Sequence, residues 1–426
     1  MHPEIKFIEG GITAAEGFSA NAICCHIKKN RNTDDTALIH SDTPCTAAGL
    51  FTQNRVKAEP VKLSIKNISN GNIRTIIANS GNANCCTGKK GADAALRMAE
   101  LAAKETGCLS DEVAVFSTGV IGADFPIEKI EENIHELASG LSKNGNEKAS
   151  RAIMTTDTKN KECAVEFILD GKKCRIGSMC KGSGMIHINL GTMLSFITTD
   201  VSISEKMLRA SLEESAKETY NCVSVDGDTS TNDSLVILAN GKAGNKKITD
   251  EGEDFRIFLT ALNKLNRIMA MKIAADGEGA TRLVQCTVEG AKTADDARSL
   301  AKAVISSSLV KAAMFGCDAN FGRFLCAMGY SGTDFSPEKT SIWFSSKGGA
   351  KRYFDDYQSF DVHGENSVLV YKDGKPEAFD EEKARKIMGE EAVEILVRCK
   401  DGNSTGTAWG CDLSYDYVKI NGDYRT

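Results

Sequence analysis

Apolar residues recur every three or four positions in several stretches of the chain, and this spacing predicts amphipathic helices. Two stretches have clear start signals. One begins at Ser204, a favourable N-cap, and one begins at Thr293 with Asp296 three residues later, close to a capping box. Another stops at Gly107, a residue typical of helix ends. The helices are predicted at residues 92–106, 204–220, 254–274 and 293–316.

Short runs of strand-like residues lie between these helices. Two of the runs flank "DGKK" at 170–173, as the strands of a hairpin do. Because helices and strands alternate irregularly, we predict a mixed α/β fold with layered sheets and not a regular parallel βαβ series. The strands are predicted at residues 75–79, 113–118, 163–169, 174–179, 193–198, 234–239, 283–290 and 392–399.

The length of 426 residues suggests two or three domains, but no Pro- or Ser-rich linker marks a boundary between them. The net charge is −6 and there is no basic tract, so we expect no nucleic-acid partner and no membrane surface as partner. The N-terminus lacks the basic and apolar regions of a signal peptide. No apolar run approaches the ~18 residues of a membrane-spanning helix. We therefore expect a cytoplasmic protein.

Fifteen cysteines are spread along the chain, and none has the Cys-x-x-Cys spacing of a zinc site or redox motif. Two pairs are adjacent, at 24–25 and 85–86. We interpret the cysteines as small, mostly buried hydrophobic residues in a reducing compartment, with a catalytic cysteine as the alternative. The six histidines are scattered, so the sequence predicts neither a histidine-based metal site nor a Ser-His-Asp triad.

Two loops resemble known ligand-binding motifs without meeting their spacing rules. In "GNANCCTGKKG" (81–91), six residues separate the first two glycines, where a phosphate-binding loop has four. In "DGDTSTNDSLVI" (226–237), Thr231 and Ile237 stand where a calcium-binding loop requires glycine and glutamate. We therefore predict neither a phosphate loop nor a calcium site.

Clusters of Gly, Thr, Asn and Asp occur at the ends of several predicted strands. Such clusters present backbone N–H groups and small hydroxyls, which suit an oxyanion or a small polar substrate. Ordinary turn chemistry explains any one of them equally well. The number of clusters and the lack of other catalytic machinery favour function. The clusters are residues 78–84, 117–122, 154–158, 181–185, 226–233 and 276–281.

Thr192 follows Gly191 at the start of an apolar, strand-like run. A threonine hydroxyl becomes a nucleophile when its own free α-amino group serves as the base. Thr192 has such a group only after the Gly191–Thr192 peptide bond is cut, and its hydroxyl can cut that bond by attacking the Gly191 carbonyl. Glycine permits the distorted backbone that this attack requires. Residue chemistry allows this reaction without singling out Thr192 among the threonines.

Five ordered motifs resemble those of the ornithine acetyltransferase family, also called glutamate N-acetyltransferases, which act in arginine biosynthesis. The resemblance extends from "GITAAEGFSA" (11–20) to the last residue. It implies the ornithine-acetyltransferase-like fold within the mixed α/β class. The motifs are "MTTDT" (154–158), "KGSGMI" (181–186), "GTMLSFITTD" (191–200), "DGEGAT" (276–281) and "WGCDLSYDYVKINGDYRT" (409–426).

The resemblance implies self-cleavage between Gly191 and Thr192, which divides the chain into segments 1–191 and 192–426. The new N-terminal threonine then takes an acetyl group from N2-acetyl-L-ornithine and passes it to L-glutamate. It also implies that no metal and no cofactor takes part, with acetyl-CoA as a possible further acetyl donor. The two fragments are expected to stay together, as two copies of each.

Site residues follow from the matched motifs. The resemblance also includes "STG" (117–119) and implies an oxyanion hole formed by Thr118 and Gly119. Lys181 and Glu278 make chemical sense for an amino-acid substrate, because one pairs with a carboxylate and the other with an ammonium group. The residues expected to contact substrate are Thr155, Lys181, Thr192, Glu278, Asn421 and Thr426.

The chain departs from the family pattern at three places. Gly191 replaces the usual alanine, "HIN" (187–189) replaces "APN", and "DANFGR" (318–323) replaces "DPNWGR". These changes bear on cleavage efficiency and substrate preference, and the role of His187 stays open. Two alternative functions also stay open: an amidase or aminopeptidase that passes the acyl group to water, and an uncleaved paralogue that binds a metabolite.

Overall fold

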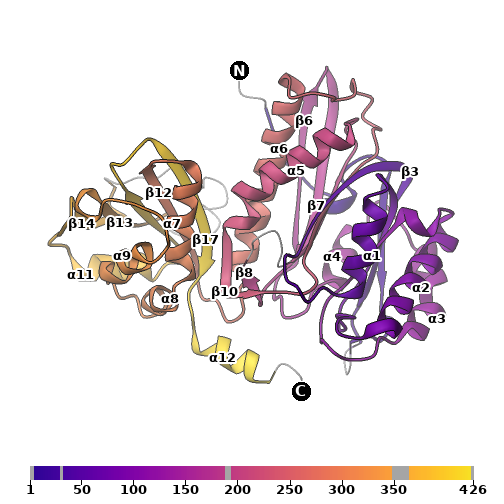
Figure 1. The fold of residues 1–426 in the computed structure, drawn as a ribbon, viewed down its shortest axis with the longest axis horizontal. Helices are drawn as coiled ribbons and strands as arrows, with labels where there is room; N and C mark the ends of the chain where they lie inside the picture. The colour runs from indigo at the N-terminus through magenta and orange to yellow at the C-terminus, as the bar shows by residue number, and fades with distance from the viewer. Residues whose placement is uncertain (1–3, 29–31, 188–192, 348–363, 424–426) are drawn as a thin grey trace. The chain divides into compact units, whose positions relative to one another are not determined.

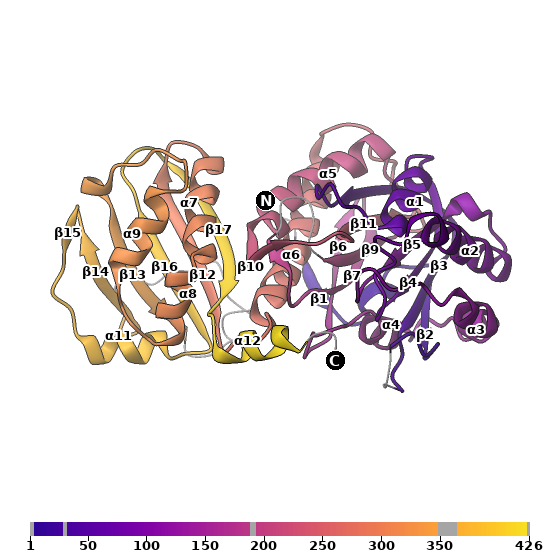
Figure 2. The same ribbon diagram turned by 60° about the horizontal axis from the view of Figure 1, so that its bottom comes forward.

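The computed structural model describes residues 4–28, 32–187, 193–347 and 364–423. The chain forms two compact units, each combining a sheet with helices (Figures 1 and 2). Unit 1 is residues 1–217 with 228–269, and unit 2 is residues 218–227 with 270–426. The predicted mixed α/β class is confirmed. The predicted segments 1–191 and 192–426 are products of a cleavage, which this division into compact units does not test.

Unit 1 is built on a mixed nine-stranded sheet in the order β1-β6-β7-β9-β11-β3-β4-β5, with β2 paired to β3. The pairs β9–β11 and β4–β5 are parallel, and the other pairs are antiparallel. The strands are β1 (Lys6–Ile8), β2 (Phe18–Ile23), β3 (Thr36–Phe51), β4 (Asn72–Asn79), β5 (Val113–Ser117), β6 (Lys161–Leu169), β7 (Lys172–Lys181), β9 (Leu194–Thr199) and β11 (Ser234–Ala239).

Helices cover both faces of this sheet. Alternate residues of β5 point to opposite faces of the sheet. Ala114 and Phe116 belong to the hydrophobic core that includes α4, and Val113 and Val115 belong to the core that includes α2 and α3. This pattern explains why β5 is buried throughout and apolar up to its last residue, Ser117, since a strand buried on both faces has no solvent-exposed side. The helices are α1 (Glu59–Ile68), α2 (Gly88–Thr106), α3 (Ile127–Ser139), α4 (Asn146–Ala152), α5 (Glu205–Glu218) and α6 (Glu253–Ala275).

Unit 2 contains a second mixed sheet, in which β15-β14-β13-β16-β12-β17-β10 are neighbours in that order. Helix α7 packs on β12 and β17, and α11 packs on β13 and β14. The strands are β10 (Val223–Thr229), β12 (Leu283–Ala291), β13 (Ser341–Ser346), β14 (Ser367–Lys372), β15 (Lys375–Pro376), β16 (Ala392–Arg398) and β17 (Ser404–Cys411). The helices are α7 (Ala294–Ser306), α8 (Ser308–Phe315), α9 (Phe321–Gly329), α11 (Glu381–Met388) and α12 (Tyr415–Gly422).

Most predicted elements are present, and one predicted helix is wrong. The hydroxyl of Thr293 accepts a hydrogen bond from the Asp296 amide at 3.1 Å, so the predicted start of α7 is confirmed. The single helix predicted over 293–316 is two helices. Ser307 adopts an extended conformation and its hydroxyl accepts from the Val310 amide, which ends α7 and begins α8. The predicted hairpin turns at Asp170 and Gly171, both with positive φ, as a tight two-residue turn requires.

In the described part of the chain, no helix is both long enough and apolar enough to cross a membrane.

Helix α1 protects the outer edge of β5, the last strand of the unit 1 sheet. The buried Ser64 hydroxyl donates to the Val115 carbonyl at 2.7 Å and accepts from the Val115 amide at 2.8 Å. Asn67 Nδ2 donates to the Val113 carbonyl at 2.8 Å. Side chains of α1 therefore take the place of a further strand, which satisfies backbone groups that an edge otherwise exposes.

Ser64→Ala is expected to leave both backbone groups of Val115 without a partner in a buried place. Each such group costs about 1–3 kcal/mol, so for the two groups we expect a loss of roughly 2–6 kcal/mol in unfolding free energy. Denaturant unfolding measures the loss, and amide hydrogen exchange locates it in residues 113–117. Ser69→Ala, on an exposed serine at the end of the same helix, is the matched control. Equal stability of the two variants would contradict this account of the edge.

Candidate active site

The segment after β5 passes unusually close to the loop after β4. Thr118 N–H donates to the Asn79 carbonyl at 2.9 Å, and Asn82 bridges to both Thr118 and Val120. Gly119 has φ +131°, and a Cβ atom there would lie 2.4 Å from the Gly81 carbonyl carbon and 2.6 Å from the Asn82 nitrogen. Only glycine fits this position, because both the backbone conformation and the space exclude a side chain.

Buried asparagines hold these two loops together. Asn79 Nδ2 donates to the Asn82 carbonyl at 2.9 Å, and Asn82 Nδ2 donates to the Asp124 carbonyl at 3.0 Å. Asn232 Nδ2 donates to the Ala83 carbonyl at 2.6 Å and to the Ser117 carbonyl at 2.8 Å. Two of the predicted clusters, 78–84 and 226–233, therefore supply the hydrogen bonds that shape the loop containing Thr118 and Gly119.

Lys181 is the last residue of β7, and the structure brings it to Thr118. Its Nζ lies 3.4 Å from Thr118 Oγ1, at the long end of the hydrogen-bond range, and both residues are only 9% exposed. The ammonium group can only donate, so the Thr118 hydroxyl accepts this bond and keeps its own proton available for another acceptor. Two predicted site residues, one at the end of β7 and one directly after β5, are therefore in contact.

Thr155 belongs to the same neighbourhood through Asp157. The Asp157 carboxylate accepts from the Thr155 amide through Oδ2 at 3.0 Å, and from the Gly182 amide through Oδ1 at 2.7 Å. Gly182 follows Lys181 directly. One buried carboxylate thus connects two of the predicted substrate residues, although the sequence analysis did not single out Asp157.

The predicted cleavage junction, Gly191 and Thr192, lies outside the described residues. The chain is described again from Met193, whose carbonyl accepts from the Ser234 amide at 2.7 Å. Strand β9 begins at Leu194, which is paired with Lys181 of β7 on one side and with Ser234 of β11 on the other. The buried strand that follows Thr192 therefore starts directly opposite the predicted substrate lysine.

Glu278 and Asn421 belong to unit 2 and are paired there. Asn421 Nδ2 donates to Glu278 Oε2 at 2.7 Å. Glu278 is 5% exposed, whereas Asn421 is exposed at the end of α12. The helix thus brings the chain back to the "DGEGAT" loop. Thr426 lies outside the described residues.

The Glu278 loop is fixed by the residues just before α12. The Asp412 carboxylate accepts from the Thr281 amide at 2.8 Å and from the Thr281 hydroxyl at 2.5 Å. The Ser414 hydroxyl donates to the Gly279 carbonyl at 2.6 Å. Gly279 has φ +68°, and a Cβ there would lie 2.5 Å from the Tyr417 nitrogen, so a side chain would separate the loop from the helix.

Cysteines whose thiol pKa is raised by burial do not provide an alternative nucleophile. Burial raises the pKa of the Cys45 thiol to about 12 and that of the Cys399 thiol to about 11, so both are protonated at neutral pH. Nine of the fifteen cysteines are buried, which confirms the interpretation as small core residues. No three His, Cys, Asp or Glu side chains within the described ranges are grouped so that they could hold a metal ion.

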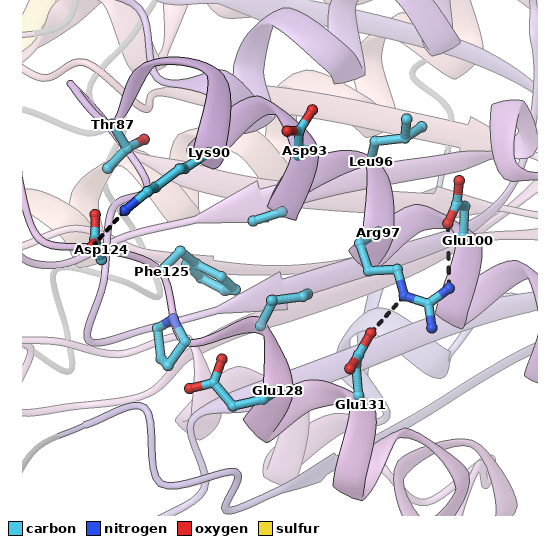
Figure 3. Close-up of a pocket in the computed structure, with 13 residues that line it drawn as sticks. Thr87, Lys90, Asp93, Leu96, Arg97, Glu100, Asp124, Phe125, Glu128 and Glu131 are labelled. Atoms are coloured by element: carbon cyan, nitrogen blue, oxygen red, sulfur yellow. Dashed lines mark hydrogen bonds and ion pairs between the residues drawn. The ribbon is translucent and has the colours of Figure 1, made fainter.

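A cavity of about 810 Å³ lies between α2 and α3 in unit 1, apart from the predicted site residues (Figure 3). Its two basic side chains are already paired. Lys90 Nζ lies 3.6 Å from an Asp124 oxygen, and Arg97 contacts Glu131 at 2.6 Å and Glu100 at 3.4 Å. No predicted residue lines this cavity, and we assign no function to it.

The arrangement in unit 1 offers a hydroxyl donor, a glycine with a constrained backbone, and a buried ammonium group near the start of β9. Such a set suits a developing oxyanion beside a carboxylate-bearing substrate. Sequence reasoning missed the supporting residues Asp157, Asn232 and Asp412. All three occur within motifs that were singled out. Their hydrogen-bond partners are mostly backbone groups, several of them far away in the sequence, and a sequence pattern does not indicate such contacts.

Comparisons with known proteins agree with the predicted resemblance. The model of the ArgJ family matches residues 19–426. The arginine biosynthesis bifunctional protein ArgJ 1 of Clostridium acetobutylicum is 48% identical over 415 residues, which cover 97% of this chain and 97% of that protein. ArgJ of Symbiobacterium thermophilum is 44% identical over 423 residues, which cover 99% of this chain and 100% of that protein.

Solved structures are matched over part of the chain. The ornithine acetyltransferase of Mycobacterium tuberculosis, solved in complex with ornithine, is 34% identical and has a TM-score of 0.41; the match covers 45% of this chain and 100% of that one. Both sequence relatives, in contrast, are matched along almost their whole length. This extent and the family model lead to one conclusion: the chain belongs to the ArgJ family.

Proposed function

We propose that this chain is a glutamate N-acetyltransferase of arginine biosynthesis, which moves an acetyl group from N2-acetyl-L-ornithine to L-glutamate. In this proposal the chain first cuts itself between Gly191 and Thr192, and the acetyl group then passes through an ester on Thr192. Membership of the ArgJ family supports the reaction class. The relatives are named as bifunctional, and acetyl-CoA is the second acetyl donor that we propose. The proposed reaction needs no metal and no bound cofactor.

The observation that carries the proposal is the contact between Lys181 Nζ and Thr118 Oγ1 opposite the start of β9. Lys181 pairs in register with Leu194, two residues after Thr192. A donor for an oxyanion and a cation for a carboxylate therefore meet beside the strand that Thr192 precedes. This is the combination that transfer of an acetyl group between two amino acids requires.

Cleavage starts when Thr192 Oγ attacks the carbonyl carbon of Gly191. The C–N bond breaks, the acyl group moves to the oxygen as an ester, and the nitrogen becomes a free amine. Water then hydrolyses the ester and leaves a carboxylate on Gly191. Thr192 is now N-terminal, and its amine, with an ordinary pKa of about 7.7–8.0, is partly unprotonated at neutral pH and can act as a base.

Acetyl transfer follows in two half-reactions. The Thr192 amine takes the proton from Oγ as this oxygen attacks the acetyl carbonyl, and the ornithine amine leaves with that proton. The amine of glutamate then attacks the ester and restores the Thr192 hydroxyl. In both steps the negative oxygen of the tetrahedral intermediate accepts from the Thr118 hydroxyl and the Gly119 N–H. Each such donor is worth a factor of about 10²–10³ in kcat.

Both substrates are amino acids, and the remaining residues suit them. The Lys181 ammonium is assigned to a substrate carboxylate, and Thr155 is held near it through Asp157. Glu278 is assigned to a substrate ammonium group, and Asn421 orients its carboxylate by the 2.7 Å hydrogen bond. Thr426 is proposed as a further contact. The fragments 1–191 and 192–426 are proposed to stay associated in the cytoplasm, as two copies of each.

Thr192→Ala is expected to give an uncut and inactive protein, because alanine has no hydroxyl to attack the Gly191 carbonyl. Intact-mass measurement should give the single 45.8 kDa chain for the variant and fragments of about 20 and 25 kDa for the parent protein, in proportion to length. The next residue, Met193, has no hydroxyl that could take over the attack. A parent protein that stays in one piece would contradict the N-terminal-threonine mechanism.

Thr118→Val is expected to lower kcat by about 100- to 1000-fold, because it removes one oxyanion donor while keeping the shape of the side chain. Thr118→Ser retains the hydroxyl and should stay within about tenfold of the parent rate. Both rates are measured per cleaved chain, so that slow cleavage is not mistaken for slow transfer. Equal rates for the valine and serine variants would remove Thr118 from the oxyanion hole.

Incubation with N2-acetyl-L-ornithine, with and without L-glutamate, separates transfer from hydrolysis. We expect N-acetylglutamate to form at the rate at which ornithine is released. Release of free acetate at an unchanged rate without glutamate would favour the amidase alternative. A protein that stays uncut and turns over neither substrate would favour the alternative of an uncleaved metabolite-binding paralogue. Replacement of the donor by acetyl-CoA tests the second proposed activity.

A further inference from the structure

A buried ion pair lies beside the predicted substrate lysine. Lys161 is the first residue of β6, and its Nζ lies 2.7 Å from Asp157 Oδ1. The two side chains are 1% and 0% exposed. In the β6–β7 hairpin Lys161 is paired with Cys180, the residue before Lys181. Asp157 holds Thr155 near Lys181 in the proposed site, whereas Lys161 has no role in the proposed reaction.

Both oxygens of the Asp157 carboxylate accept hydrogen bonds from neighbouring groups. Besides Lys161 Nζ it accepts from the amides of Gly182 and Thr155, at 2.7 and 3.0 Å. Burial alone would raise the pKa of Asp157, but the ammonium groups of Lys161 and Lys181, together with the Gly182 amide, lower it to about 2. Asp157 is therefore ionised at neutral pH and brings a full negative charge close to Lys181.

The charges of the three side chains explain why a second lysine is present. Lys181 and Asp157 alone would sum to zero, and the carboxylate would compete with the substrate for the Lys181 ammonium group. With Lys161 the group carries one net positive charge. Stability does not explain the pair, because a buried ion pair is often no more stable than well-packed apolar residues of similar size.

We propose that Lys161 is a positioning residue of the substrate-carboxylate site. It neutralises Asp157, so that Asp157 holds Gly182 and Thr155 through hydrogen bonds while Lys181 keeps its charge for the carboxylate of the substrate. This inference rests on the proposed substrate role of Lys181.

The carboxylate assigned to Lys181 is the α-carboxylate, which both substrates share. The test compares L-glutamate with its α-amide as acetyl acceptors, since the amide has nearly the same shape and keeps the γ-carboxylate but lacks the charge of the α-carboxylate. The readout is the ratio of kcat/KM for the two acceptors. Lys161→Met leaves Asp157 to pair with Lys181, so the preference for L-glutamate should fall by about tenfold or more, mainly through a higher KM. A purely structural role would slow both acceptors alike and leave the ratio unchanged, which would overturn the proposal.

Lys172→Met is the matched control, because it removes the same charge from an exposed lysine at the other end of the same hairpin. Its preference for L-glutamate should equal that of the parent, since an exposed charge at that distance is screened by water and salt. A control variant that loses the preference as fully as Lys161→Met would overturn a specific role for Lys161.

The double variant Asp157→Asn with Lys161→Met removes both charges and restores one net positive charge at Lys181. Its preference for L-glutamate should lie within about threefold of the parent, even where the single Lys161 variant is too unstable to purify. Asparagine keeps an acceptor for only one of the two amides, so a lower kcat towards both acceptors is expected. Loss of the preference in this double variant would overturn the charge argument.

Lys181→Met distinguishes failure of this inference from failure of the proposed function. If Lys181→Met keeps the preference for L-glutamate, the assignment of Lys181 to the substrate carboxylate is wrong, and the present inference falls with it. If Lys181→Met abolishes the preference while Lys161→Met keeps it, only the role of Lys161 is overturned.

Discussion

The pairing of β7 with β9 determines where the groups of the candidate site meet. Its register places Lys181 opposite Leu194, so the last residue of β7 lies beside the first residue of β9. A shift of one residue would turn Lys181 to the other face of the sheet and separate it from Thr118. The parallel pairing of β4 with β5 then brings the Thr118 segment beside the loop after β4. A register fixed by backbone hydrogen bonds and buried side chains thus sets the chemistry, more than the local shape of any loop does.

Buried polar side chains hold the loops of this site in place. They form hydrogen bonds with loop backbone groups that have no partner in a neighbouring strand. Asn232 and Asn82 each donate to two backbone carbonyls, and Ser64 satisfies both backbone groups of Val115 at the sheet edge. An incomplete network destabilises the fold, since each buried polar group without a partner gives up its hydrogen bonds to water and forms none in the protein. The same reasoning applies to the Asp157 carboxylate, whose charge is offset by Lys161. In unit 2, Asp412 has the corresponding role for the Glu278 loop.

Sequence patterns predicted what depends on local periodicity and caps, such as α7 with its Thr293 cap and the 163–179 hairpin. They missed β3, a sixteen-residue strand whose register shifts between His40 and Cys45, because Asp42, Thr43 and Pro44 interrupt any alternation there. The family motifs supplied Thr118, Thr155 and Lys181, and the structure shows that these three belong to one connected group. The supporting contacts were beyond reach, since Asn232 bonds to a carbonyl 149 residues away and no spacing rule links such positions. The sequence did not predict the Asp157–Lys161 pair either. Two oppositely charged residues four positions apart usually form an exposed ion pair, and the sequence does not show that this pair is buried.

The most direct test of the account is to search for the acetylated enzyme itself. The cleaved protein is mixed with N2-acetyl-L-ornithine without acceptor, stopped in acid, digested, and its peptides are sequenced by mass spectrometry. The account predicts one acetyl group on the hydroxyl of an N-terminal Thr192, formed in step with ornithine release and removed when L-glutamate is added, with N-acetylglutamate as the product. An acetyl group at another residue, or transfer to L-glutamate with no acetylated Thr192 at any time, would contradict it.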